Sequence, residues 1–410
     1  MRHLLMLLSL APLLWSAEDL KSLLEAADRN DLVAAYEAQY RAAESSRAAA
    51  RSSYLPRIDL GANAVLLDKT GTIDVRESYT AYAKAGFTLF DGFRRENLLE
   101  ELAAKSRSSR AELSGFRKEL ALQVTQTYFE LLNLRGDIDA QRQQRRQLTE
   151  QLERQERFLA ARIATEEEVE RIRAAVANAD YRIASLRYQA ESLASQLQTL
   201  TGIEVSEPLP GSFIPPEPGE TTEPDAIRAM RYDAEALDAS AKQRTASYYP
   251  NLAVEDTYSY YEYDGASTAF PIERLDRQNR LVVNLSMNLI DFSAGSREKE
   301  AVMAQKLALE HRIAHEAKRS DANVRLALKA IERAVSMVAA AEQALSASAK
   351  TLETVSRKYR ARLVDYVTYL DALTQHTDAT AQFNRAGNTL QGAYAQYYFD
   401  AGYDPKEFLR

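Results

Sequence analysis

Few residues in this sequence have the type and spacing that catalysis or metal binding needs. His311 and His315 stand four residues apart, so a helix would place both on one side as a possible metal pair. No carboxylate completes a third ligand, and a solvated helix face explains the pair better. His376 has no neighbouring nucleophile or acid in an elbow-like turn, and the sequence has neither a glycine-rich phosphate loop nor a cysteine. We therefore predict no enzyme, no metal site and no cofactor.

Carboxylates gather instead at two predicted helix starts. Thr165 and Glu168 form a capping box, and Asp365 has the position of an N-cap. The acidic run Glu166-Glu167-Glu168 complements the helix dipole at the first of these starts. Each start follows a short turn that contains an arginine, Arg162 or Arg362. The capping role alone accounts for these side chains unless the turns meet at a constriction.

The elements that carry these turns occur twice. Leu89-Phe90-Asp91 and Leu289-Ile290-Asp291 each end a predicted strand and open a predicted helix of about seventy residues, which would be about 100 Å long. From Val283 to Leu289 apolar and polar residues alternate strictly, as in a strand with one apolar face. Residues 58–64, 79–89 and 252–260 alternate likewise, and the first two segments predict a hairpin. The chain therefore reads as a two-fold internal repeat.

The repeat sets the predicted boundaries. Arg2 and His3 precede an apolar run that is too short to span a bilayer, which is typical of an export signal. A net charge of −7 argues against a nucleic-acid partner. The predicted segments are a signal peptide at 1–17, a first repeat at 18–203, a Pro- and Gly-rich linker at 204–224, a second repeat at 225–400 and a C-terminal tail at 401–410.

Four amphipathic strands cannot close a barrel, because the smallest closed barrels have about eight strands. An open sheet with an apolar face would aggregate, and lipid forbids unpaired edges. Several chains must therefore share one barrel with polar side chains inside and apolar side chains towards lipid. The predicted lumen residues are Thr80, Lys84, Thr88, Asn284, Ser286 and Asn288. The predicted lipid-facing residues are Phe87, Val283, Leu285, Met287 and Leu289. The alternative is a soluble β-subdomain whose apolar face packs on helices.

The sequence Tyr359-Arg-Ala-Arg-Leu-Val-Asp-Tyr-Val-Thr-Tyr-Leu-Asp-Ala372 resembles the helix tip of the TolC-like outer-membrane efflux channels, YxxGxxDYLTVLDA. Pro56 and Pro250 before strands, the junctions at Asp91 and Asp291, and the repeat are similar too. The resemblance implies a mainly α-helical homotrimer. Its chains would share a twelve-stranded β-barrel in outer-membrane lipid, and their coiled-coil-like helices would form a tunnel in the periplasm. It also implies docking to a periplasmic adaptor (membrane fusion) protein and, through it, to an inner-membrane transporter.

The sequence departs from the family at the tip. The family's tip glycine is Arg362 here, and Ala161 or Arg162 in the first repeat. Some members carry two aspartates three residues apart at the periplasmic entrance; Asp371 matches the second, whereas Thr368 stands at the first.

On this resemblance, clustered carboxylates at the mouth would attract cations and the arginines would hold the tip shut through several ion pairs. The predicted entrance residues are Arg162, Glu166, Glu167, Glu168, Arg362, Asp365, Thr368 and Asp371. The sequence thus predicts a trimeric export duct, with a pore-less periplasmic coiled-coil scaffold as the alternative. It does not identify the cargo.

Overall fold

The computed structural model describes residues 19–69, 75–205, 208–217, 219, 221–266 and 274–410, so the predicted signal peptide lies outside it. The chain forms two compact units, each built from separate stretches of sequence. One, here called the sheet unit, comprises Ala35–Leu113 and Asp225–Ala317. The other, here called the hairpin unit, comprises the chain up to Ala34, Ser114–Pro224 and Lys318–Arg410. Each is described separately.

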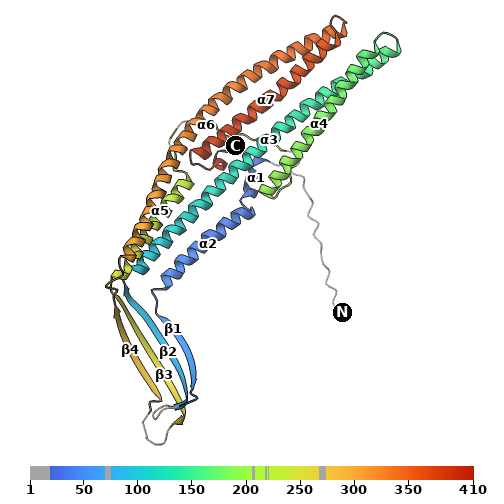
Figure 1. The fold of residues 1–410 in the computed structure, drawn as a ribbon. Helices are drawn as coiled ribbons and strands as arrows, with labels where there is room; N and C mark the ends of the chain where they lie inside the picture. The colour runs from blue at the N-terminus through green and yellow to red at the C-terminus, as the bar shows by residue number, and fades with distance from the viewer. Residues whose placement is uncertain (1–18, 70–74, 206–207, 218, 220, 267–273) are drawn as a thin grey trace, which may run out of the picture. The chain divides into compact units, whose positions relative to one another are not determined.

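The sheet unit contains four strands in the order β1-β2-β3-β4, all antiparallel (Figure 1). The strands are β1 (Arg57–Leu66), β2 (Val75–Asp91), β3 (Asn251–Ala266) and β4 (Arg277–Ser286). The predicted hairpin of the first two strands is confirmed, since Arg57 to Leu66 pair with Gly86 to Glu77. Strands from the two halves of the sequence join through β2 and β3, which pair from Val75↔Ala266 to Asp91↔Asn251.

The register separates the side chains into a polar and an apolar face. Cross-strand partners in an antiparallel sheet share a face. Thr88, Ala253 and Asn284 are partners on one face, and Phe87, Val254 and Val283 are partners on the other. The apolar face is uncovered, because four of its aliphatic side chains are 61–81% exposed; these are Ile58, Leu60, Val283 and Leu285. This exposure contradicts the alternative of a soluble subdomain with its apolar face packed on helices.

The prediction that the last strand continues to Leu289 was wrong. Strand β4 ends at Ser286, and residues 287–291 have no regular structure. The reason is the partner strand, because β3 begins at Asn251, which is paired with Ser286. Pro250, just before Asn251, has no N–H to donate to a further pair. Met287, Asn288 and Leu289 therefore have no partner in β3.

Two aspartates turn the chain from strand into helix. Asp91 precedes Gly92 and Phe93, and Asp291 precedes Phe292 and Ser293; all four following residues have positive φ, between 52° and 71°. The carboxylate of Asp91 accepts from the Arg95 amide at 3.2 Å, and that of Asp291 from the Gly295 amide at 2.9 Å. The same local device thus starts α3 (Arg94–Ala160) and α6 (Ala294–Arg360).

The sheet unit also holds most of α2 (Asp31–Ser52), α5 (Asp225–Arg244), η1 (Ala246–Tyr248) and the first parts of α3 and α6. Its helices meet through buried alanines such as Ala104, Ala236 and Ala239. Ion pairs at the surface join them, including Arg107–Glu235 and Lys306–Asp238, both at 2.7 Å. Small side chains let these helices approach closely.

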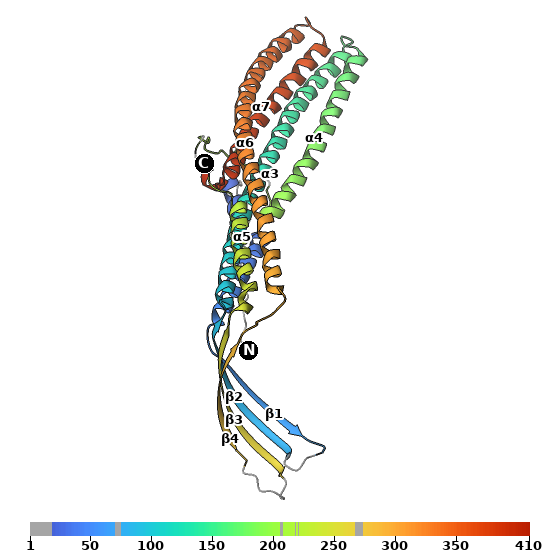
Figure 2. The same cartoon turned by 60° about the vertical axis from the view of Figure 1, so that its left-hand side comes forward.

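The hairpin unit is a row of helices in the order α4, α3, α7, α6, seen in both views (Figures 1 and 2). It contains α1 (Leu20–Ala27), the second parts of α3 and α6, α4 (Glu166–Thr201), α7 (Tyr366–Asp400) and η2 (Pro405–Phe408). Arg145 on α3 contacts Asp180 on α4 at 2.5 Å, and Ser348 on α6 contacts His376 on α7 at 3.3 Å.

Part of the apolar packing in the hairpin unit lies between neighbouring helices. One core cluster of buried side chains joins α3, α4 and α7, namely Leu148, Ile172, Ala179, Tyr366, Tyr369 and Leu373. Among the described residues, no helix combines the length and the apolarity that a membrane crossing requires.

Candidate functional site at the helix tips

The two turns at the helix tips have the same backbone structure. Arg162 donates to the Leu159 carbonyl and Ile163 to the Phe158 carbonyl, at 2.9 and 2.8 Å. Arg362 and Leu363 repeat these bonds to Tyr359 and Lys358, both at 2.9 Å. This pair of hydrogen bonds is the Schellman motif, which requires a left-handed residue just after the helix. Each long helix therefore ends, and reverses, by one mechanism.

The left-handed position is held by arginine in both turns. Arg162 and Arg362 each have φ of 58°. The sequence left open whether Ala161 or Arg162 matches the glycine of the family, and the backbone assigns that place to Arg162. A non-glycine residue in this conformation costs about 1–2 kcal/mol. The tip turns thus bear local strain that a glycine would relieve.

Side-chain caps start the helices that leave the tips. Thr165 accepts from the Glu168 amide at 3.3 Å. Asp365 accepts from the Thr368 amide at 2.9 Å and from the Thr368 hydroxyl at 2.6 Å. These two hydrogen bonds, the hydroxyl first, lower the pKa of Asp365 below its ordinary value. Both predicted caps are present.

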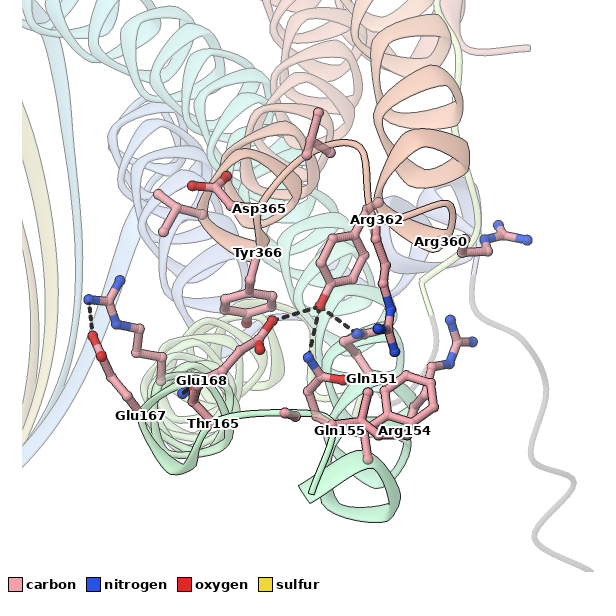
Figure 3. A pocket seen from close by; sticks show the side chains of 17 residues that line it. Gln151, Arg154, Gln155, Thr165, Glu167, Glu168, Arg360, Arg362, Asp365 and Tyr366 are labelled. Carbon is pink, nitrogen blue, oxygen red and sulfur yellow. Dashed lines mark hydrogen bonds and ion pairs between the residues drawn. The ribbon is translucent and has the colours of Figure 1, made fainter. Parts of the chain in front are cut away.

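A cluster of tyrosines links the two tips; Figure 3 shows one of them, Tyr366, together with Gln151 and Glu168. The hydroxyl of Tyr359, at the end of α6, accepts from Gln151 of α3 at 2.8 Å and lies 3.5 Å from the Glu168 carboxylate of α4. Its ring stacks on Tyr369 with centroids 5.0 Å apart, and Tyr366 lies beside both. Three helices therefore meet at a single phenol.

Burial controls the ionisation of this cluster. It raises the pKa of Tyr359 to about 12, and the nearby Glu168 charge acts in the same direction. Burial also raises the pKa of Tyr366 and of Tyr369. The Tyr366 hydroxyl is buried and has no hydrogen-bond partner among the described residues. The cluster is therefore neutral at physiological pH and gives the tips an apolar, weakly hydrogen-bonded contact.

An open cavity of about 490 Å³ lies over the tyrosines, between the two turns. Arg154, Arg171, Arg360 and Arg362 bring positive charge to its lining, and Glu167, Glu168 and Asp365 bring negative charge. The Arg362 guanidinium lies 5.4 Å from the centre of the Phe158 ring, a cation–π contact from one tip to the other. Glu167 pairs with Arg171 at 2.6 Å on its own helix.

The predicted entrance residues are only partly gathered in this cavity. Arg362, Asp365, Glu167 and Glu168 line it, whereas Arg162, Glu166, Thr368 and Asp371 do not. Asp371 is exposed on α7, where it accepts from Gln375 at 2.8 Å. The ion pairs predicted for Arg162 and Arg362 are not formed within the described part of this chain. The tips are joined instead by the tyrosine cluster, by the Gln151–Tyr359 hydrogen bond and by the Arg362–Phe158 contact.

Sequence reasoning missed the residues that join the tips. Tyr359, Tyr366 and Tyr369 lie inside the quoted tip motif, but no role was assigned to them or to Gln151. Tyr366 and Tyr369 are three residues apart on α7, the spacing of one helix face, which was the available signal; Tyr359 lies on α6, before the turn. Within the described ranges, no group of three or more metal-ligating side chains occurs.

The predicted barrel residues separate as the alternation predicted wherever they lie in strands. Thr80, Lys84, Thr88, Asn284 and Ser286 are on the polar face, where Lys84 pairs with Glu255 at 2.6 Å. Phe87, Val283 and Leu285 are on the apolar face. Which face meets lipid stays a prediction.

Comparisons with known proteins agree with this architecture. Residues 23–203 match the family model of the outer membrane efflux proteins. The search of curated proteins gives no significant match. Three solved structures share the fold, each at 12–17% sequence identity.

The first, the CmeC outer membrane channel of Campylobacter jejuni, aligns with a TM-score of 0.81 at 12% identity, over 94% of this chain and 86% of that one. The open state of the Neisseria gonorrhoeae MtrE outer membrane channel gives 0.80 at 17%, over 94% and 89%. The outer membrane protein VceC of Vibrio cholerae gives 0.78 at 14%, over 93% and 96%. Residues 23–203 therefore match the outer membrane efflux protein family, and the resemblance to the TolC-like channels seen in the sequence is confirmed.

Proposed function

We propose that this chain is one of three identical subunits of an outer-membrane channel, the exit duct of a tripartite efflux or type I secretion system. The observation that carries the proposal is the four-stranded sheet with an uncovered apolar face. Its edge strands β1 and β4 have no partner in the described part of the chain beyond β2 and β3. A sheet with open edges and exposed leucines is stable only when something covers both.

A trimer would pair the open edges of the sheet and give each of its two faces a suitable environment. An even number of antiparallel strands places β1 and β4 in opposite directions, so β4 of one copy can pair antiparallel with β1 of the next. Twelve strands close a cylinder without edges. The face of Thr80, Lys84 and Asn284 would then line water, and the face of Phe87, Val283 and Leu285 would contact lipid. The helices would extend into the periplasm.

The element lengths support descent from a duplicated unit. Helices α3 and α6 each have 67 residues, and α4 and α7 have 36 and 35. The proposed organisation keeps a signal peptide at 1–17, repeats at 18–203 and 225–400, a linker at 204–224 and a tail at 401–410. In the trimer, α3–α4 hairpins would then alternate with α6–α7 hairpins around the axis.

The helix tips are the proposed gate. Three copies would repeat Asp365, Asp371 and Thr368 around one mouth, with Glu166, Glu167, Glu168, Arg162 and Arg362 beside it. Opening requires the separation of Tyr359 from Gln151 and of Arg362 from Phe158, contacts that are individually weak enough for a partner to break. A periplasmic adaptor, joined to an inner-membrane transporter, would supply that partner.

Planar-bilayer recording tests the proposal. The protein is purified in detergent and added to a planar lipid bilayer, where it is expected to give discrete single-channel current steps. Asp371→Ala is expected to reduce cation selectivity, and Arg362→Ala to increase the time spent open. A protein that stays in the soluble fraction at high salt and never conducts would favour the pore-less scaffold instead. Normal channels with unchanged gating in both variants would overturn only the assignment of the tip residues.

A further inference from the structure

An open cavity of about 400 Å³ lies on the apolar face of the sheet, near the strand ends that are remote from the helices. The rings of Tyr79 and Tyr260 stand at its sides, and its floor is Ala62, Ala64 and Ala81. These five residues share the apolar face, because they are cross-strand partners in two adjacent rows of the register. The cavity therefore opens on the side that the proposed function places in lipid.

The cavity continues along the strands as a groove. One row nearer the helices, Leu60 and Tyr258 are the two cross-strand partners of Ala83 and stand on either side of it. Leu60 is 81% exposed and Tyr258 is 51% exposed, so the described part of the chain does not cover them. We call the cavity and its continuation the tyrosine groove, after the rings of Tyr79, Tyr258 and Tyr260.

The length of the tyrosine groove is that of an acyl chain in one leaflet. Its apolar part lies between two carboxylates of β3 on the same face, Asp256 and Glu262. At about 3.4 Å per residue, six residues of strand span about 20 Å. A tilt of about 45° reduces this to about 14 Å across the membrane, close to half of a hydrocarbon core of about 30 Å.

Two opposite charges lie at the end of the groove that is remote from the helices. Glu262 follows Tyr260 by two residues on β3, and Arg277 of β4 is the cross-strand partner of Tyr260. Both charged side chains are exposed on the apolar face, and neither forms an ion pair with a described residue. A carboxylate and a guanidinium side by side suit a group that carries both an ammonium and a phosphate.

The occupant that fits this groove is an amphiphile. A polypeptide would bring backbone N–H and C=O groups into hydrocarbon, where they would lack partners. An acyl chain has no such groups. Tyrosines are also enriched in membrane proteins at the level where lipid chains meet their polar heads, which is the level of Tyr79 and Tyr260 beside Glu262.

We propose that the tyrosine groove binds one acyl chain of a phospholipid whose head carries an ammonium group, in the leaflet remote from the helices. Its phosphate would lie at Arg277 and its ammonium at Glu262. This inference rests on the proposed function and adds a lipid site to the face that the proposed barrel turns towards the membrane.

Native mass spectrometry of the protein released from detergent tests the acyl-chain part of the site. Dioleoyl phosphatidylethanolamine is titrated into the wild type, which is expected to retain one lipid per chain. Ala83→Phe fills the groove and should lower retention about tenfold. Ala253→Phe is the matched control, because it makes the same change on the polar face and should retain lipid as the wild type does.

A second lipid with the same chains tests the charges. Dioleoyl phosphatidylglycerol has the phosphate but no ammonium, and the wild type should retain about fivefold less of it. Glu262→Gln should bring the two lipids to equal retention, since the carboxylate that attracts the ammonium is gone.

The mass of the particle separates the possible failures. A trimer in detergent overturns the lipid site, and leaves the proposed function intact, if Ala83→Phe retains as much lipid as the wild type. Equal retention of the two lipids by the wild type overturns the site in the same way. A single chain that is soluble without detergent overturns the proposed function, and the site with it.

Discussion

At the scale of single residues, each tip turn has an arginine in a strained backbone conformation, and the side chain of one of the two makes a contact across the tips. Arg162 and Arg362 both accept a left-handed backbone that favours glycine. Only Arg362 gains a compensating contact, its position over the Phe158 ring. Variants of the two arginines therefore distinguish the effect of backbone strain, present in both, from that of the ring contact, which Arg362 alone of the two makes.

We expect Arg162→Gly to stabilise its turn by about 1 kcal/mol, because glycine removes the left-handed penalty and no ring contact is lost. Hydrogen exchange of the Ile163 amide should slow about fivefold. Arg362→Gly should gain less, since it also loses the cation–π contact. Faster exchange at Ile163 in Arg162→Gly would contradict the strain assigned to this turn.

The tyrosine cluster predicts an alkaline transition. The pKa of Tyr359 is raised from 10.0 to about 12, so the stability that comes from its neutral form is fully present below pH 10 and is lost between pH 10 and about 12. The thermal midpoint of the wild type should therefore fall more steeply over that interval than that of Tyr359→Phe. Parallel curves for the two proteins would show that Tyr359 titrates normally.

The residue scale is also where the sequence was least informative. Charge and motif resemblance drew attention to Asp365 and Arg362, both of which reach the cavity. The contact between the tips depends on Gln151 and Tyr359, which are 208 residues apart. No local pattern joins such residues, because their meeting is decided by where the ends of α3 and α6 lie relative to each other.

At the scale of elements, caps and alternation determine where helices and strands begin and end. Asp365 starts α7 through its two hydrogen bonds to Thr368. Its lowered pKa means that this support is present above pH 3.8 and is lost as the pH falls through the lowered value.

Removing the cap should fray the first turn of α7. In Asp365→Ala, the amides of Thr368 and Tyr369 are expected to exchange faster at neutral pH, because their hydrogen bonds are lost or loosened. Asp371→Ala is the control, since that carboxylate accepts from the side chain of Gln375 and caps no backbone amide in the described part of the chain. Equal protection in both variants would mean that the cap contributes nothing.

The two sheet faces predict opposite responses to one substitution at neighbouring positions. Val283→Arg places a charge on the apolar face and should reduce assembled protein in the outer membrane, since a cation facing lipid costs about 2–4 kcal/mol at mid-depth. Asn284→Arg places the same charge on the polar face and should assemble normally. The measured quantity is the yield of heat-modifiable trimer, and the reverse order would exchange the proposed lumen and lipid faces.

Element positions could be predicted from the sequence because their signals are local. Alternation located all four strands, and the turns at Arg162 and Arg362 located the helix ends. Strand β4 was wrongly predicted to include Met287 to Leu289. Alternation of apolar and polar residues indicates which side chains would share a face, but it does not indicate whether a partner strand continues beside them. The start of β3 after Pro250 decided that end.

At the scale of the whole molecule, the sheet is incomplete by itself. It has exposed leucines, and its edge strands β1 and β4 have no outer partner in the described part of the chain. The proposed trimer would supply that partner, because further copies around one axis would pair these edges. The sequence predicts this need for several chains from the strand count alone.

The mass of the particle extracted from membranes in mild detergent tests the central claim most directly. Light scattering coupled to size exclusion, corrected for bound detergent, should give three times the mass of one mature chain. A monodisperse single chain that stays soluble without detergent would contradict the account.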